Sequence, residues 1–298
     1  MARTRVGVIG LGIMGSAMAA NLVKGGVEVI GYDPVAACRA RLKKSGGTAA
    51  ASVIEVARSA DILITSLPST KALAQVARDI AGAKNRRCVV IETSTFPIAD
   101  KEAARKHLAK SGAILLDCPL SGTGAQARTK DLVVYASGPT AAIKRCLPVF
   151  SGFARGHYDL GRFGNGSKMK FAANLLVAIH NVSAAEAIIL ARKSGINAAL
   201  AVKVLGDGAG SSRMLQVRGP MMAKRAYKDA TMKIEVWQKD MKIIGEFLRV
   251  LGSPAPLFDA TKKIYNKAMK LGLAKSDTAA VCAVLEARAP RKAKRTRS

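Results

Sequence analysis

The stretch RVGVIGLGIMGSAMAANLVKGG, residues 5–26, decides the fold of the first half of this chain. A β-branched apolar run leads into Gly10-x-Gly12-x-x-Gly15, and an alanine-rich helical pattern follows at once. In such a strand–turn–helix unit, the glycines permit a tight turn, close approach of a pyrophosphate, and close packing of helix on strand. The free N–H groups at the helix N-terminus favour the phosphates. The dinucleotide-binding residues predicted in this segment are Gly10, Gly12, Ile13, Met14 and Gly15.

An acid follows the glycines at the end of the next strand pattern, in Tyr32-Asp33-Pro34. A carboxylate about 20 residues past the glycines accepts hydrogen bonds from the adenosine ribose and repels a 2′-phosphate. Asp33 therefore favours NAD as the cofactor. Asp-Pro is also a helix-start signal, so the residue can serve as a cap at the same time. Arg39 and Arg41 lie nearby, and NADP stays open.

Short apolar runs alternate with alanine-rich amphipathic segments up to about residue 150. The runs are mostly unbroken, as expected of strands covered on both faces, and they read RVGVIG, VEVIGYD, DILITSL, CVVIETS, AILLDCP and LVVYASG. The helical segments between them include 14–24, 34–44, 70–81 and 98–110. This alternation predicts an α/β fold, a doubly wound parallel sheet of the Rossmann type, over residues 1–161.

The pattern changes beyond Gly161. From Ser167 onward, long helical patterns are separated by the clusters KSGI, GDGAGSS, VRGP and LGSPAP, which predicts an all-α domain over residues 162–287. Its most apolar segment, 175–191, contains His180, Asn181 and Glu186, so we expect a buried helix rather than a membrane span. The basic end of the chain, 288–298, is predicted to be a disordered, solvated tail.

Charge and cysteine usage limit which partners and which cellular compartment suit this chain. The chain has 48 Lys and Arg against 20 Asp and Glu, a net charge of +28, and the tail carries only six of these positive charges. Such a surface attracts anions, which include small carboxylates, phosphates and nucleic acid. The five cysteines are scattered without C-x-x-C spacing. That pattern favours the reducing cytoplasm and predicts neither a metal site nor a disulfide framework.

Four motifs, in this order and spacing, resemble the β-hydroxyacid dehydrogenases, relatives of 3-hydroxyisobutyrate dehydrogenase and tartronate semialdehyde reductase in the 6-phosphogluconate dehydrogenase superfamily. The motifs are GLGIMGSAMAANLVKGG, DCPLSGTGAQA, GNGSKMKFAANL and WQKDM. The resemblance extends from Val6 to about Leu285 and implies a Rossmann domain followed by a helical domain.

Two lysines, Lys168 and Lys170, stand inside an apolar helical pattern, where a lysine is costly unless it is paired or used. The family pattern G-x-G-x-x-x-K-x-x-x-N falls on Gly164, Gly166, Lys170 and Asn174. The resemblance therefore implies that Lys170 is the acid–base residue, that Asn174 contacts the same substrate, and that the two glycines let the substrate approach the helix. Spacing agrees, because residues i and i+4 share a helix face. Lys168 is expected to be a snorkelling or solvent-exposed lysine.

The resemblance implies further contacts. Ser121, Gly122 and Thr123 would hold a substrate carboxylate in a small-residue turn, although Thr123 stands where the family has a second glycine. The further cofactor contacts predicted are Leu67, Pro68, Ser94 and Lys239, of which Lys239 is implied by the resemblance. The first three follow strands, and doubly wound folds bind ligands at the carboxyl ends of their strands.

Together these features predict an NAD(P)-dependent oxidoreductase that interconverts a small, anionic 3-hydroxy acid and its oxo acid or semialdehyde. We expect a homodimer or homotetramer from the long apolar helices. The alternative is a catalytically idle nucleic-acid-binding or chromatin-binding module of the same fold, which the charge would suit. Retention of Lys170 and Asn174 speaks against it. An imine reductase is a third reading, disfavoured because those enzymes usually carry another residue at the lysine position.

Overall fold

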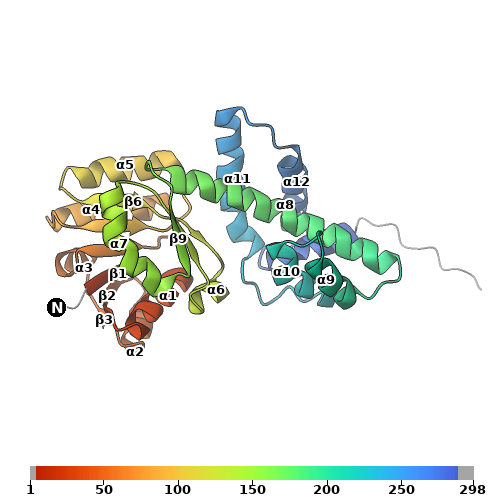
Figure 1. Ribbon diagram of the computed structural model, residues 1–298, viewed down its shortest axis with the longest axis horizontal. Coiled ribbons are helices and arrows are strands. Elements are labelled where there is room, and N and C mark those ends of the chain that lie inside the picture. The colour runs from red at the N-terminus through yellow and green to blue at the C-terminus, as the bar shows by residue number, and fades with distance from the viewer. Residues whose placement is uncertain (1–4, 288–298) are drawn as a thin grey trace, which may run out of the picture. The chain divides into compact units, whose positions relative to one another are not determined.

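The computed structural model describes residues 5–287 of the 298-residue chain (Figure 1). The chain divides into two compact units, and the division falls between Phe171 and Ala172. The first unit is an α/β fold. The described part of the second unit is helical, apart from one isolated bridge between Lys233 and Asp277. The basic tail predicted over 288–298 lies outside the described residues.

The first unit is built on a six-stranded sheet with the order β3-β2-β1-β4-β5-β6. Every pair of neighbouring strands is parallel, and this order is that of the dinucleotide-binding folds. The predicted doubly wound sheet is therefore confirmed. Its strands are β1 (Arg5–Ile9), β2 (Glu28–Tyr32), β3 (Thr48–Ala49), β4 (Ile62–Thr65), β5 (Val89–Glu92) and β6 (Ile114–Asp117).

Alternate residues of these strands enter two separate apolar cores, because successive side chains point to opposite faces of a sheet. On β4, Ile62 and Ile64 join one core while Leu63 joins the other. The first core also contains residues of α1 (Ile13–Lys24), α2 (Ala36–Lys44) and α7 (Thr140–Phe153). The second contains residues of α3 (Val53–Ser59), α4 (Thr70–Gly82) and α5 (Ile98–Ala109). Burial on both faces explains why the strands are unbroken apolar runs.

One strand lies elsewhere than expected. The run LVVYASG forms β8 (Val133–Ala136), which belongs to a second sheet of order β7-β8-β9. In that sheet β8 is antiparallel to β7 (Leu120–Ser121) and parallel to β9 (Gly156–Asp159). Its residues alternate between buried and half-buried positions, whereas β4 and β5 are buried throughout. The run therefore has the pattern of a strand covered on one face, and its placement in the large sheet was wrong.

Most of the remaining helices form the second unit. The remaining helices are α6 (Gly124–Arg128), α8 (Asn165–Lys193), α9 (Ala198–Asp207), α10 (Arg213–Lys224), α11 (Ile234–Leu251), α12 (Pro256–Lys270) and α13 (Val281–Glu286), with a 3₁₀ turn at Thr278–Ala280. Of these, α6 belongs to the first unit, and α8 begins in the first unit and continues into the second.

By length and composition alone, α8 could cross a membrane. Its buried polar residues have partners inside the second unit, however. Asn181 is fully buried and donates to the hydroxyl of Tyr265 at 2.8 Å and to the carbonyl of Thr278 at 2.9 Å. A buried amide nitrogen whose hydrogen bonds go to protein oxygens is typical of a core helix, so α8 is the core helix predicted over 175–191.

Candidate active site

The glycine turn after β1 has the geometry that the fingerprint predicts. Gly10 has φ +89°, and a Cβ there would lie 2.2 Å from the carbonyl oxygen of Ser66. A Cβ at Gly15 would lie 1.9 Å from the carbonyl oxygen of Gly10. Both positions therefore exclude any larger residue, because real Cβ atoms do not approach so closely. These two glycines bring the end of β1, the start of α1 and the end of β4 together.

Gly12, the middle glycine of the fingerprint, faces open space. A Cβ at Gly12 would meet nothing within 4 Å, and Gly12 and Ile13 are exposed, with Ile13 exposed by 73%. Gly12 offers no side-chain cap to α1, so the helix N-terminus presents its N–H groups outward. Met14 is half-buried and packs on the first core. This open cradle of backbone amides fits a pyrophosphate.

Asp33 is buried at the carboxyl end of β2, beside the glycine turn. Its Oδ2 accepts a hydrogen bond from the Leu11 amide and its Oδ1 accepts one from the Val35 amide, each at 2.8 Å. The guanidinium of Arg39 donates to the Asp33 carbonyl at 2.6 Å and lies over the Tyr32 ring. The carboxylate is thus held rigidly next to the dinucleotide cradle, and each oxygen keeps a lone pair for a further donor.

Leu67 and Ser94 follow the adjacent strands β4 and β5, and a hydrogen bond joins the two residues. The Leu67 amide donates to Ser94 Oγ at 2.9 Å, and the Ser94 amide donates to Oε1 of Glu92 at 2.9 Å. Pro68 follows Leu67 and is exposed. The predicted cofactor contacts therefore lie together at the carboxyl edge of the sheet, where a bound dinucleotide is expected.

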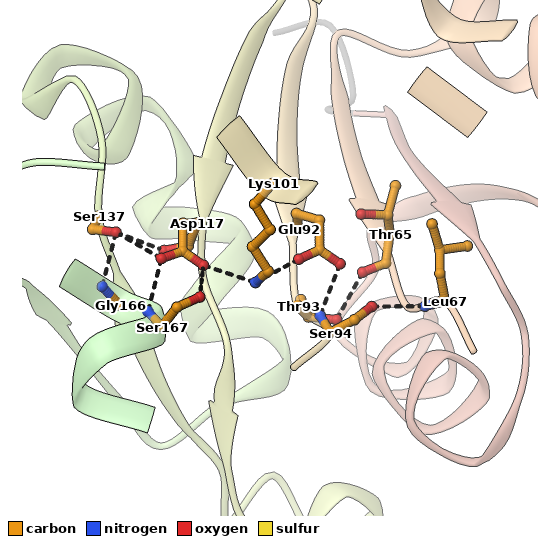
Figure 2. A network of polar contacts seen from close by, with 10 residues as sticks. All are labelled: Thr65, Leu67, Glu92, Thr93, Ser94, Lys101, Asp117, Ser137, Gly166 and Ser167. Atoms are coloured by element: carbon orange, nitrogen blue, oxygen red, sulfur yellow. Dashed lines mark hydrogen bonds and ion pairs between the residues drawn. The ribbon is translucent and has the colours of Figure 1, made fainter. Parts of the chain in front are cut away.

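A buried ion cluster lies behind this edge, and sequence reasoning did not identify it. Lys101 on α5, Glu92 and Asp117 are each 0% exposed, and the Lys101 ammonium contacts Glu92 Oε2 at 2.6 Å and Asp117 Oδ1 at 2.8 Å (Figure 2). Burial alone would lower the pKa of Lys101, but the two carboxylates outweigh it and raise that pKa. The available signal was helical spacing, since Lys101 shares the buried face of α5 with Ala104 and Leu108.

The start of α8 is attached to the same cluster (Figure 2). The Ser167 amide donates to Asp117 Oδ2 at 2.7 Å and the Ser167 hydroxyl to Asp117 Oδ1 at 2.8 Å. The Gly166 amide donates to Ser137 Oγ at 2.9 Å. A Cβ at Gly166 would lie 2.4 Å from the carbonyl oxygen of Tyr135. The glycine expected to admit a substrate thus lets the helix approach the protein's own backbone.

The two lysines of α8 differ in their surroundings. Lys168 is exposed, and its ammonium donates to Asn165 Oδ1 at 3.2 Å. Lys170 is half-buried. Asn174, one turn further along, is buried, and its Nδ2 donates to Asp240 Oδ2 at 3.1 Å. The helix therefore places an amine and an anchored amide on one face.

The turn after β7 holds Ser121, Gly122 and Thr123, all half-buried. Gly122 has φ +134°, and a Cβ there would lie 2.6 Å from a Leu132 methyl group, so glycine is required. The amide and the hydroxyl of Thr123 both donate to Gln126 Oε1, at 3.0 and 3.3 Å. Thr123 thus acts as the cap of α6, and its amide would have to leave Gln126 before it could bind a substrate carboxylate.

Helix α11 carries Lys239 and Asp240. The Lys239 side chain is 44% exposed, and its ammonium lies 3.5 Å from Asp240 Oδ1. Asp240 is buried and receives the Asn174 amide at its other oxygen. Asp240 is a further residue that the site prediction from the sequence left out, although it belongs to the quoted motif WQKDM.

The cysteines do not form part of this arrangement. All five are buried with free thiols, and burial raises the pKa of Cys88 to about 12, which makes it a poor nucleophile. Over residues 5–287, no group of three or more His, Cys, Asp or Glu side chains is placed to hold a metal ion.

Comparison with known families matches both units. Residues 5–163 match the NAD binding domain of 6-phosphogluconate dehydrogenase. Residues 164–285 match the domain described as NAD-binding of NADP-dependent 3-hydroxyisobutyrate dehydrogenase. The two matches meet at the start of α8, which is the region that the ion cluster holds.

Individual relatives are similar over nearly the full length. The chain is 31% identical to L-threonate dehydrogenase of Cupriavidus necator, over 93% of this chain and 94% of that protein. It is 28% identical to the chloroplastic glyoxylate/succinic semialdehyde reductase 2 of Arabidopsis thaliana, over 97% and 81%. A crystal structure of 3-hydroxyisobutyrate dehydrogenase from Salmonella typhimurium superposes with a TM-score of 0.85 at 29% identity, over 94% and 99%. These comparisons do not support the alternative of a catalytically idle nucleic-acid-binding module.

Proposed function

This chain belongs to the β-hydroxyacid dehydrogenase family of NAD(P)-dependent oxidoreductases, and from that premise we propose that Lys170 is its acid–base residue and that Asn174 contacts the same substrate oxygen. The observation that carries the proposal is the contrast between the two lysines of α8. Lys168 is exposed, whereas Lys170 is half-buried and shares its helix face with the buried Asn174.

A lysine suits the chemistry of carbonyl reduction. When bound, NAD(P)H supplies the hydride to the carbonyl carbon. The Lys170 ammonium stabilises the negative charge that develops on the carbonyl oxygen and donates a proton to it. Asn174 keeps one N–H on Asp240 and offers the other to the same oxygen. In the oxidative direction, the Lys170 amine must be neutral so that it can accept the hydroxyl proton.

The substrate class follows from the turn after β7 and from the basic charge. A small 3-hydroxy acid, or its oxo acid or semialdehyde, places its carboxylate on Ser121 and Gly122, where a hydroxyl and a backbone amide suit an anion. Thr123 contributes less, because its amide donates to Gln126. The names of the relatives, which refer to L-threonate, glyoxylate and succinic semialdehyde, support a small acid or aldehyde.

Asp33 makes NAD(H) the preferred cofactor. Its buried carboxylate lies beside the dinucleotide cradle. There it accepts hydrogen bonds from the ribose hydroxyls and repels a 2′-phosphate. Arg39 is occupied by the carbonyl oxygens of Asp33 and Pro34, which leaves it less available to a phosphate. Leu67, Pro68 and Ser94 complete the contacts from this unit, and Lys239 is the contact from α11.

The active form is a homodimer or homotetramer in the cytoplasm. On α9, Leu200 and Val204 are 54% and 60% exposed, and their i, i+4 spacing makes one apolar stripe. Leu176 and Leu190 on α8 are also more than half exposed. Contiguous exposed apolar side chains mark association surfaces. The five free cysteines favour a reducing compartment. Light scattering of the purified chain tests the oligomer, and a monomer would reject it.

The catalytic proposal is tested by comparing Lys170→Ala with Lys168→Ala. A panel of 3-hydroxy acids and their aldehydes is followed at the nicotinamide absorbance band, and NADH binding is titrated in parallel. Removing a positioned general acid costs about 10²–10⁴-fold in rate, so kcat of Lys170→Ala should collapse while NADH still binds. Lys168→Ala should keep most of the activity. Full turnover by Lys170→Ala would remove Lys170 from the mechanism.

A further inference from the structure

One buried ammonium joins the ends of two adjacent strands. Lys101 lies between Glu92, the last residue of β5, and Asp117, the last residue of β6, with all three side chains 0% exposed (Figure 2). Ion pairs at such depth rarely add stability over an apolar replacement. A role in geometry is the better explanation for this cluster, and its hydrogen bonds show which segments it holds.

On one side, the cluster holds the first turn of α8. Asp117 accepts the amide and the hydroxyl of Ser167, and the Ser137 hydroxyl lies 3.2 Å from the same carboxylate while it accepts the Gly166 amide. These oxygens accept hydrogen bonds from N–H groups at the start of α8. The residue before the helix, Gly164, has no side chain that could cap those groups. The carboxylate also complements the positive end of the helix. Lys170 follows Ser167 by three residues on the same rigid helix.

On the other side, the cluster holds the loops that border the dinucleotide. Glu92 Oε2 contacts Lys101, and its Oε1 accepts the Ser94 amide. Ser94 in turn accepts the Leu67 amide. A continuous chain of contacts therefore runs from Leu67 through Ser94, Glu92, Lys101 and Asp117 to Ser167 (Figure 2).

We propose that Lys101 is a positioning residue, which sets the place of the Lys170 helix turn relative to the loops that border the cofactor. It acts only through Glu92 and Asp117 and touches neither substrate nor cofactor. This inference rests on the proposed role of Lys170. Because a displacement of about 1 Å from the productive geometry can cost about 10²-fold in rate, the link matters for turnover even though it lies outside the site.

The test is the double variant Lys101→Met with Glu92→Gln. Met approximates the length of lysine, and Gln keeps an oxygen for the Ser94 amide. Removing one cation and one anion together leaves the cluster at its original net charge, with Asp117 still at the helix start. The matched control is Lys242→Met with Glu246→Gln, the same pair of changes at an exposed ion pair on α11.

Three measurements separate positioning from simple destabilisation. Active sites are counted by NADH titration, kcat per site is measured well below the melting temperature, and amide hydrogen exchange is followed in residues 163–172. We expect the double variant to bind NADH within about threefold of wild type and to lose roughly 10- to 100-fold in kcat per site. Exchange at the first turn of α8 should be faster by roughly tenfold or more. The control should match wild type in all three.

Unchanged kcat per site and unchanged exchange, with only a lower melting temperature, would overturn the inference. If the double variant does not fold, Ser137→Ala provides the test, because it frees the Gly166 amide without disturbing the charges. It should also show lower kcat per site and faster exchange, and wild-type values would reject the positioning role. An inactive Lys170→Ala beside a fully active double variant would reject the inference alone. A fully active Lys170→Ala would reject the proposed function, and the exchange result would then still report whether the cluster holds the helix.

Discussion

The side-chain amide of Asn174 donates a hydrogen bond to Oδ2 of Asp240 at 3.1 Å, which joins α8 to α11 within the second unit. Both residues are buried. A carboxylate can only accept, so the contact requires the nitrogen of Asn174 to face Asp240 and its carbonyl oxygen to face away. The orientation of a proposed substrate contact therefore depends on an acid 66 residues later in the chain.

Asp240→Ala should weaken catalysis by releasing Asn174. The freed amide can rotate, and misplacing a group by about 1 Å can cost about 10²-fold in rate, so we expect kcat/KM to fall by roughly tenfold or more. Steady-state kinetics with the best substrate of the panel measures it. Asp259→Ala, an exposed acid on α12, is the control and should behave as wild type. Wild-type kinetics for Asp240→Ala would mean that Asn174 does not need this anchor.

Asp33→Asn should shift the cofactor preference toward NADP(H). Hydrogen bonds to a charged group contribute about 1.5–3 kcal/mol, so NADH affinity should fall by roughly tenfold or more, while NADPH binding improves as repulsion of the 2′-phosphate disappears. Fluorescence titration of both cofactors gives the ratio of the two Kd values. Asp100→Asn, on the exposed side of α5, should leave that ratio unchanged. Tighter binding of NADPH than NADH by the wild type would show that Asp33 serves the turn alone.

Acid stability of the second unit should depend on Asp277. This residue is 0% exposed and pairs with Arg218 at 3.1 Å. Burial would raise its pKa, but Arg218 and the bonded amides of Ala279 and Met232 outweigh burial and lower the pKa below 3.8. A depressed carboxyl pKa stabilises the fold above the unfolded value, and that stability is lost as the pH falls through the folded value.

Asp277→Asn should therefore be less stable than wild type at pH 7, by about 3–5 kcal/mol as for other broken buried pairs. The difference should shrink as the pH falls below 3.8. Denaturant unfolding at pH 7 and near pH 3 measures both values. Asp229→Asn is the control. Asp229 is exposed and lies two residues before Thr231, whose amide donates to Asp277. A difference independent of pH would attribute the effect to packing rather than charge.

Deleting residues 288–298 should leave turnover intact. The match to the family ends at residue 285, and the deleted segment carries six basic and no acidic residues. Its loss should weaken binding to DNA at low salt, because that binding scales with the number of phosphates neutralised. Steady-state kinetics tests the expected turnover, and a salt-dependent mobility shift tests the expected loss of DNA binding. A folded but inactive truncation would show that the tail serves the enzyme.

Local patterns account for what could be predicted from the sequence. The glycine spacing and the acid after β2 are short-range features. The close backbone contacts at Gly10 and Gly15 are those of the expected turn, and Asp33 lies beside that turn. The helical spacing of Lys170 and Asn174 is equally local. These elements are decided by backbone sterics and by apolar periodicity, which a single segment carries by itself.

Partners distant in the chain were decided only by the tertiary structure. The β8 strand looked like its neighbours, yet its alternating burial and its pairing with β7 place it in a second sheet. Helical spacing could place Lys101 on the buried face of α5, but it could not name the partners of the ammonium, because the two carboxylates come from strands that only the folded sheet brings to it.

The sequence by itself determined where a dinucleotide and an acid–base lysine are expected, because those motifs depend on residues close together in the chain. The anchors of that lysine's helix are long-range. Asp117 holds Ser167 across 50 residues, and Asp240 holds Asn174 across 66. A buried polar group must find a partner wherever packing supplies one, so only the folded chain could decide which carboxylates these would be.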